Sequence, residues 1–175
     1  RDRLIKKEGR LDDIVEQVVR DVFAQVSKNK DYEEPIAFYR YILDNVSYQV
    51  DLLKNHQSFR SNKMKENFLW EIAQDELESK YKILGTDEVV AQFQRMAILK
   101  AIDENWVEQV DYLQQLRTAL TGQYTNQKNP LVEFFQEAYQ SFERMKFLSK
   151  EQMIRNLLLS RVEINKKGEI VLHFP

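Results

Sequence analysis

The chain has 175 residues, of which 43% are hydrophobic, so it can bury an apolar core as one domain or as a domain with a small insertion. Its 26 basic and 28 acidic residues give a net charge of -2, which provides no general attraction for a phosphate backbone and disfavours nucleic acid as a partner. It has no cysteine, which excludes disulfides and thiolate metal sites and fits a reducing, cytoplasmic environment.

The sequence also limits any contact with a membrane. No apolar run approaches the roughly 18 residues of a membrane span, and the start of the chain lacks the apolar core of a signal peptide. Any membrane contact is therefore expected to be peripheral. Because the chain begins with Arg1 and its first residues read as the end of a charged helix, we expect it to be a piece of a longer protein.

Helical periodicity dominates the chain, because only 4 Gly and 3 Pro interrupt its 175 residues. Residues 1–8 are expected to end a helix that stops near Gly9. A second helix is predicted from Asp12 to about Lys28, and a short third one from Pro35. The faces expected to be buried carry Ile14, Val18, Val22 and Val26 in the second helix, and Ile36, Tyr39 and Leu43 in the third.

The stretch that follows has a weaker pattern. Val46, Tyr48 and Val50 alternate with polar residues, which indicates a short extended segment. Either Ser58 or Ser61 can cap a further helix, which should end at Gly85. This helix should bury Phe68, Ile72 and Tyr81.

A long amphipathic hairpin is predicted next. Its first helix has Thr86 as N-cap and spans on the order of 50 Å, and its second begins with Asn129 as cap and Pro130 in the first turn. Apolar residues of the first helix recur about every 3.4 residues, near the 3.5-residue repeat of supercoiled helix pairs. They are Val89, Phe93, Met96, Leu99, Ile102, Trp106, Val110, Leu113, Leu116 and Leu120; the second helix has Leu131, Phe134, Phe135, Ala138, Tyr139, Phe142 and Met145.

Both apolar ladders are most simply core, so the functional interest lies in the turn between them, Gly122 to Asn129. Amide and hydroxyl side chains can bond to any peptide backbone, and a tyrosine ring adds contact that does not depend on sequence. Such a turn could hold an unfolded polypeptide, but helix connections are commonly polar because they are exposed. The candidate contact residues are Gln123, Tyr124, Thr125, Asn126, Gln127 and Lys128.

No constellation predicts catalysis or a metal site in this chain. There is no phosphate-binding loop of the G-x4-G-K-[ST] type, and the only two histidines, His56 and His173, lie far apart in the sequence. Neighbouring carboxylates such as Asp103 and Glu104 point in different directions on a helix. We therefore predict no catalytic residue and no metal ligand, and expect His173 on the surface of a terminal strand.

Between Trp106 and Met145 the chain contains Leu116-Arg117 and Gln127-Lys128-Asn129-Pro130, and in these residues and their spacing it resembles the helical scaffold of the SecA preprotein translocase motor. The family pattern is W-x9-L-R-x9-Q-K-D-P-x2-E-Y-x2-E-x-F-x2-F-x2-M. Upstream, Phe93, Leu99 and Asp103 fit the same register, and residues 20–23 resemble the entry to the helical wing of the family. The matching positions are Trp106, Leu116, Arg117, Gln127, Lys128, Asn129, Pro130, Glu133, Phe134, Glu137, Tyr139, Phe142 and Met145.

The resemblance implies an all-α fold and a division into four parts. Residues 1–8 would end the long scaffold helix, 9–85 would form the helical wing, 86–158 the two-helix finger of the scaffold, and 159–175 a small terminal hairpin. Scaffold packing would involve Trp106, Leu116, Pro130, Phe134, Tyr139, Phe142 and Met145. The hairpin tail, in place of a cysteine-bearing zinc tail, makes the chain similar to the accessory SecA paralog of Gram-positive bacteria.

The same resemblance implies that the chain is a non-catalytic module of an export motor. This motor would be cytoplasmic and peripherally associated with the cytoplasmic face of the plasma membrane. The parent would bind ATP and Mg through nucleotide-binding domains outside this chain, and its partners would be the preprotein and a SecY-type channel. The fingertip Gly-Tyr of the family falls on Tyr124-Thr125, so the tyrosine of this chain lies one position earlier and the family's glycine is lost.

A helical adaptor, whose hairpin binds a helix of another protein, is the competing prediction. An adaptor should expose a sizeable apolar patch along the hairpin, whereas a translocase finger should be buried along its scaffold side and polar at its tip.

Overall fold

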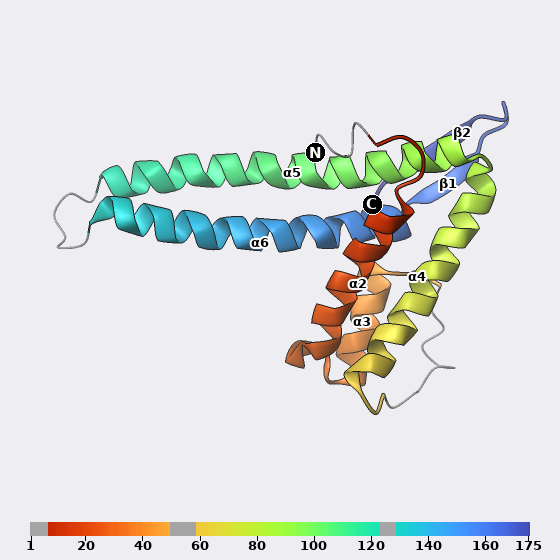
Figure 1. Ribbon diagram of the computed structural model, residues 1–175, viewed down its shortest axis with the longest axis horizontal. Coiled ribbons are helices and arrows are strands. Elements are labelled where there is room, and N and C mark those ends of the chain that lie inside the picture. Colours follow the sequence, from red (N-terminus) through yellow and green to blue (C-terminus); the bar gives the residue numbers. More distant parts are fainter. Residues whose placement is uncertain (1–6, 50–58, 123–128) are drawn as a thin grey trace.

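The computed structural model describes residues 7–49, 59–122 and 129–175. A long pair of antiparallel helices, which we call the finger, extends from a group of shorter helices at one end (Figure 1). The finger comprises α5 (Asp87–Thr121) and α6 (Pro130–Leu158). The shorter elements, which we call the helical group, are α2 (Asp12–Lys28), the 3-10 turn η1 (Lys30–Tyr32), α3 (Pro35–Asn45) and α4 (Asn62–Leu84). The only described strands, β1 (Arg161–Ile164) and β2 (Ile170–His173), form a short terminal hairpin, so the predicted all-α fold class with such a hairpin is confirmed.

Helix α2 begins and ends where the sequence predicts. Asp12 and Asp13 lie at its positive end and Lys28 lies in its last turn, as the helix dipole favours. Its buried face is rotated slightly from the predicted one, because Ile14 and Val18 lie at the edge of the core. The buried residues are Val15, Val19, Val22, Phe23, Val26 and Ser27.

Helix α3 has Pro35 in its first turn, as predicted. The prediction that Ile36 is buried is wrong, because this side chain is 85% exposed. Ile36 lies two residues before the buried Phe38, about 200° around the helix, so the two side chains cannot share a face. Tyr39 is buried, as predicted.

The segment after α3 is a turn, not the short extended segment that the sequence predicts. The backbone N–H groups of Val46 and Ser47 both donate to the carbonyl of Ile42, at 2.8 and 3.0 Å. The Ser47 hydroxyl then accepts from the N–H of Gln49 at 3.1 Å. These local bonds take the place of strand pairing, so the alternation of Val46 and Tyr48 has no structural meaning here; Val50 lies outside the described residues.

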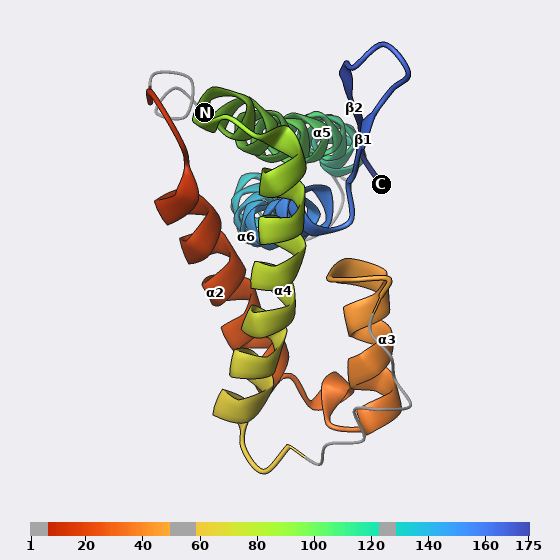
Figure 2. The same cartoon turned by 90° about the vertical axis from the view of Figure 1, so that its right-hand side faces the viewer.

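Helix α4 lies beside α2 (Figure 2), and a capping residue stands at each of its ends. Ser61 is the N-cap and accepts from the N–H of Met64 at 3.2 Å, while Ser58 lies outside the described residues. Gly85 ends the helix with a φ of 81°, a left-handed conformation that favours glycine. The Arg20 guanidinium of α2 lies 4.3 Å from the centre of the Trp70 ring of α4.

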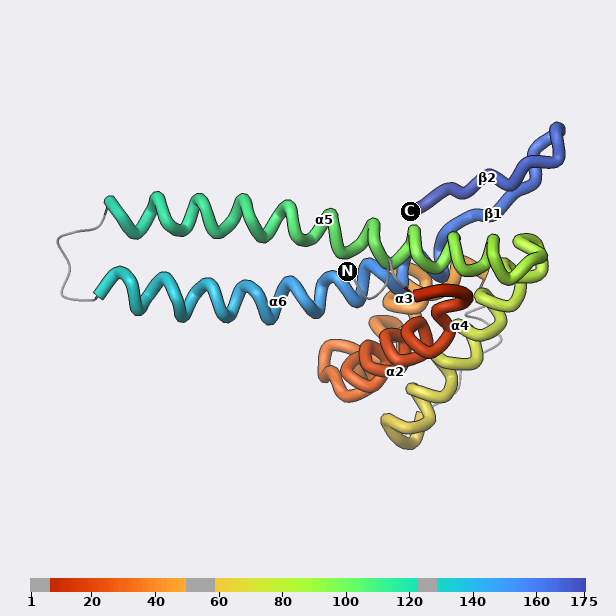
Figure 3. The backbone as a smooth tube through the Cα atoms, turned by 45° about the horizontal axis from the view of Figure 1, so that its top comes forward, coloured from red at the N-terminus to blue at the C-terminus, as the bar shows by residue number. Residues whose placement is uncertain are grey.

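The two finger helices run side by side along their length (Figure 3). The predicted caps of both are confirmed: Thr86 accepts from the N–H of Val89 at 3.4 Å, and Asn129 accepts from the N–H of Leu131 at 3.1 Å. Pro130 occupies the first turn of α6, where its missing N–H costs no helical hydrogen bond.

The terminal strands pair antiparallel, with Val162 opposite Leu172. Gly168 makes the turn with a φ of 80° and donates to the carbonyl of Asn165 at 2.9 Å. Phe174 stacks on Phe93 of α5, with ring centres 6.4 Å apart, which holds the hairpin against the base of the finger. His173 is exposed on its strand, as predicted.

The core lies where the base of the finger meets the helical group. Ile98 and Ala101 of α5 and Leu157 of α6 are fully buried there with Phe23 of α2. Ionic contacts span the same junction, among them the ion pair of Lys150 on α6 with Asp21 on α2, at 2.8 Å.

The predicted division into scaffold, wing, finger and tail keeps its status as a prediction. The elements change at the expected places, since α4 ends at Leu84, α5 begins at Asp87 and β1 follows α6. The expected helix end at residues 1–8 falls mostly outside the described residues, and neither Lys7 nor Glu8 is helical.

Candidate functional site: the finger

The finger is held together by a narrow seam between α5 and α6. Half-buried leucines of α5, Leu113 and Leu116, lie on the seam, and Leu120 is buried near its far end. At mid-length the buried amide of Gln109 donates to the hydroxyl of Ser141 at 2.8 Å, and this hydroxyl donates to the carbonyl of Ala138 at 2.9 Å. The seam therefore joins apolar contact with one directional polar bridge.

The six predicted contact residues of the fingertip, Gln123 to Lys128, lie outside the described residues. What the structure describes is how the chain enters and leaves this turn. Helix α5 ends with Gly122 as its C-cap, and Asn129 and Pro130 restart the chain as α6. The far ends of α5 and α6, which flank these residues in the sequence, lie remote from the helical group (Figure 1).

The seven residues predicted for scaffold packing divide into two sets. Leu116, Pro130, Phe134 and Met145 are partly buried. Trp106, Tyr139 and Phe142 are 53%, 67% and 40% exposed, so they do not belong to a core within the described chain. The reason is geometric: two helices share one seam, and an apolar surface wider than that seam stays outside it.

One face of α6 carries a continuous row of exposed apolar side chains, which we call the aromatic stripe: Leu131, Phe135, Tyr139 and Phe142. Their spacing of four, four and three residues places them above one another on a helix. Three are more than 60% exposed, and the Lys146 ammonium lies 5.5 Å from the centre of the Phe142 ring. A row of this kind is typical of a surface that contacts another segment or protein.

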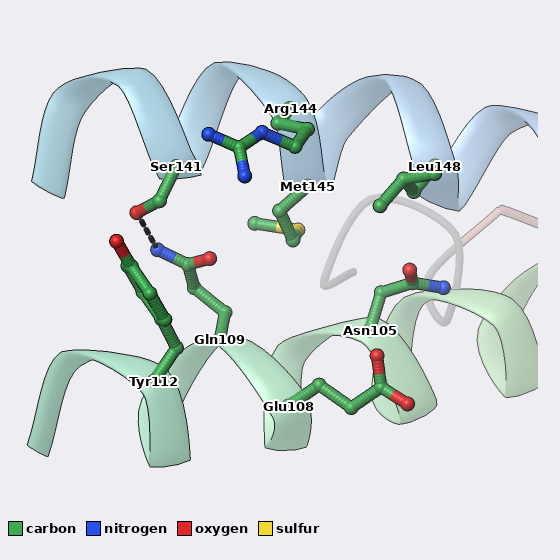
Figure 4. Close-up of a pocket in the computed structure, with 8 residues that line it drawn as sticks. All are labelled: Asn105, Glu108, Gln109, Tyr112, Ser141, Arg144, Met145 and Leu148. Carbon is green, nitrogen blue, oxygen red and sulfur yellow. Dashed lines mark hydrogen bonds between the residues drawn. The ribbon is translucent and has the colours of Figure 1, made fainter. Parts of the chain in front are cut away.

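A groove of about 220 Å³ lies across the seam near the middle of the finger (Figure 4). The hydrogen bond between Gln109 and Ser141 lies at one end of the groove, with the Tyr112 ring beside it (Figure 4). Its rim carries opposite charges, Glu108 from α5 and Arg144 from α6. The remaining lining residues are Asn105, Met145 and Leu148. Within the groove the Ser141 hydroxyl accepts from Gln109 and donates to the carbonyl of Ala138, so it is not bonded to a base.

An acidic side chain at the base of the finger lies in an unfavourable environment. Burial raises the pKa of Glu151 on α6, and the nearby Arg155 opposes that rise. Glu151 in turn adds to the effect of burial in raising the pKa of Tyr41 on α3. Partial burial at the base of the finger therefore disfavours the ionised form of the Glu151 carboxyl.

Two important buried polar residues were not predicted from the sequence. Gln94 of α5 is fully buried, and Lys80 of α4 is 7% exposed and donates to the carbonyl of Leu158 at 2.6 Å. The only signal available was that both positions fall on the inner face of an amphipathic helix, where a polar residue is unexpected.

Within the described residues, no group of three or more His, Cys, Asp or Glu side chains could hold a metal ion. In the same residues, none of the helices combines the length and the apolar character required to cross a bilayer.

Comparisons with known proteins give the chain a family context. Residues 1–161 match the family described as "SecA Wing and Scaffold domain". All 175 residues are 44% identical to protein translocase subunit SecA 2 of Streptococcus gordonii and 46% identical to that of Streptococcus sanguinis, in each case over 22% of the relative. SecA 2 of Staphylococcus epidermidis is 31% identical over 91% of this chain and 20% of its own length. The chain therefore spans about a fifth of the length of these relatives.

Proposed function

Because the chain belongs to the SecA family, as its wing and scaffold region, we propose that it is a non-catalytic coupling module of a protein translocation motor. In the whole protein, ATP-driven movements of nucleotide-binding domains would pass through this module to the finger. The fingertip would contact the preprotein at the mouth of a SecY-type channel. ATP and Mg would bind the other domains of the parent, on the cytoplasmic side of the membrane and peripheral to it.

The observation that carries this proposal is the finger itself. The 35 residues of α5 extend about 50 Å at 1.5 Å per residue, and most of that length projects beyond the helical group. Its base is fixed in a core, and the far ends of α5 and α6 lie at the opposite end (Figure 1). A lever with a fixed base and a remote tip is suited to transmitting movement, provided that the parent supplies two states of its base.

The fingertip role can be tested in the full-length parent by replacing residues 123–126 with Gly and Ser. We expect preprotein export to fall while ATP hydrolysis remains measurable, because the change removes the amide and ring contacts and leaves both helices. The matched control replaces Lys166 and Lys167, in the turn between β1 and β2, with Ser and Gly. Export equal to that of the unchanged protein after the fingertip replacement refutes the proposed contact.

A second candidate function is supported by the aromatic stripe. An exposed apolar patch along the hairpin is the sign expected of a helical adaptor, and Phe135 and Tyr139 are 63% and 67% exposed. In this alternative the stripe binds an amphipathic helix of another protein.

Thiol labelling separates the adaptor function from burial of the stripe within the parent. A cysteine introduced at Tyr139 should react quickly in this cysteine-free chain. If it reacts equally quickly in the full-length parent, the stripe is free for another protein. Protection in the parent alone shows that the remaining four fifths of the polypeptide covers it, which excludes the adaptor function for this face.

A further inference from the structure

The side chain of Gln94 joins three elements at the junction between the finger and the helical group. It lies on α5, two turns from the start of that helix, and it is fully buried. Its Oε1 accepts from the backbone N–H of Leu11 at 2.7 Å. Its Nε2 donates to Oδ1 of Asp12 at 2.7 Å and to the hydroxyl of Tyr81 at 2.8 Å. Both amide hydrogens are thereby used.

The partners of Gln94 lie near the first and last residues of the helical group. Leu11 and Asp12 begin α2, where the chain enters the helical group, and Tyr81 lies in the last turn of α4, where it leaves. One side chain of the finger is therefore hydrogen-bonded to both the N-terminal and the C-terminal end of the helical group.

Charged groups enclose this junction from the outside. The Arg10 guanidinium lies 4.8 Å from the centre of the Tyr81 ring and forms ion pairs with Asp12 at 2.8 Å and with Asp87 at 3.2 Å. The neighbouring Arg95 donates to the backbone carbonyl of Lys7 at 2.6 Å. The segment before α2 is thus held against the start of α5 by several polar contacts around one buried amide.

Directional bonds and apolar packing contribute differently to such a junction. The hydrophobic effect is itself non-directional, whereas a hydrogen bond weakens steeply once its donor–hydrogen–acceptor angle falls below about 120°. The bonds of Gln94 are short, and they converge from two elements on one planar amide. They restrict the orientation of the helical group relative to α5 in a way that the surrounding Val and Leu contacts do not.

We propose that Gln94 is a positioning residue that fixes the angle between the helical group and the finger. The inference does not rest on the fingertip function, since it concerns only the geometry of this chain. Loss of the Gln94 amide should leave the helical group and the finger folded but allow the angle between them to vary.

The test uses the distance between two spin labels in the 175-residue chain, which has no native cysteine. Cysteines replace Lys63, at the far end of α4, and Thr118, near the far end of α5, both of which are exposed. With Gln94 present, the distance distribution should be narrow. Gln94→Met keeps the length of the side chain and removes all three bonds, and it should broaden the distribution about twofold or shift its mean.

A matched control separates orientation from stability. Gln109→Met removes a buried amide from the same helix, but the partner of Gln109 is Ser141 within the finger. It should lower stability and leave the distance distribution narrow. A distribution that broadens equally in both variants overturns the proposal, because the effect would then be general loosening.

A rescue experiment tests the bonding pattern itself. Gln94→Glu alone places a carboxylate against Asp12 and should broaden the distribution. Adding Asp12→Asn leaves the net charge of the pair at its original value and lets the new amide donate to the new carboxylate, so the distribution should narrow again. Failure of the double variant to narrow it, or an unchanged distribution in Gln94→Met, refutes the positioning role. If Gln94→Met does not fold, Tyr81→Phe removes a single bond, and an unchanged distribution in that variant also refutes it.

Discussion

Lys80 is a buried ammonium group that joins α4 to the end of α6, and its removal should be costly. Its Nζ donates to the carbonyl of Leu158 at 2.6 Å and to Oε2 of Glu76 at 2.9 Å. The Leu158 carbonyl belongs to the last turn of α6, where carbonyls have no helical partner. Glu76 is also bonded to the hydroxyl of Ser47, so the lysine sits in a small network that links three elements.

Lys80→Met keeps the apolar stem and removes the charge. Taking one member from a buried ion pair costs about 3–5 kcal/mol, and the low end applies because the Glu76 side chain is 19% exposed and retains its bond to Ser47. We therefore expect a loss of about 3 kcal/mol in the free energy of unfolding. For a chain of this size the loss corresponds to a melting temperature lower by about 6–12 °C.

Urea unfolding followed by far-UV circular dichroism measures this loss. The control is Lys82→Met, which removes an exposed lysine from the same helix and should change stability by less than about 0.5 kcal/mol. Equal unfolding midpoints for the two variants would show that the network adds no net stability, and the reasoning from burial would be wrong.

Three further predictions concern stability. Phe23→Ala should cost about 3–5 kcal/mol in urea unfolding, because Phe23 is fully buried in the core; a loss below about 1 kcal/mol contradicts this. Gly85→Ala should cost about 1 kcal/mol by the same assay, through its φ of 81° alone, since an added Cβ meets no atom within 4 Å; an unchanged midpoint contradicts it. Glu151→Gln should raise the melting temperature at neutral pH. The raised pKa of Glu151 means that the folded state holds its proton more tightly than the unfolded state, so native stability falls as pH rises from the ordinary pKa of this carboxyl through its raised pKa. The advantage of Glu151→Gln should disappear in melting curves at acid pH; an advantage that does not depend on pH contradicts the assignment.

Helix ends were the part of the fold that could best be predicted, because capping is local chemistry. Ser61, Thr86 and Asn129 each accept the backbone bond expected of an N-cap, and Gly85 ends α4 in the conformation that glycine allows. The error at residues 46–49 has the same origin, since the Ser47 hydroxyl bonds locally and forms a turn where alternation suggested a strand.

Burial could be predicted less well, because it depends on what covers a helix and not on the helix alone. The spacing of Trp106 and Tyr139 is that of an apolar ladder, but the seam between α5 and α6 covers only part of each helix. Conversely, Gln94 and Lys80 are buried because partners from distant segments satisfy them, 78 or more residues away in the chain. Periodicity contains no information about such partners.

The finger combines a firmly held base with a lightly held shaft, and this difference bears on how it could work. At the base, Ile98, Ala101 and Leu157 are buried from all sides by the helical group. Along the shaft, one seam of partly buried leucines and the Gln109–Ser141 bridge hold two helices whose outer faces remain exposed. Segments with few buried contacts open locally at a lower free energy than the core, so rare local opening should begin in the shaft and not at the base. If the finger acts as the proposed lever, a further contact on the exposed aromatic stripe would add buried surface to the shaft and stiffen it.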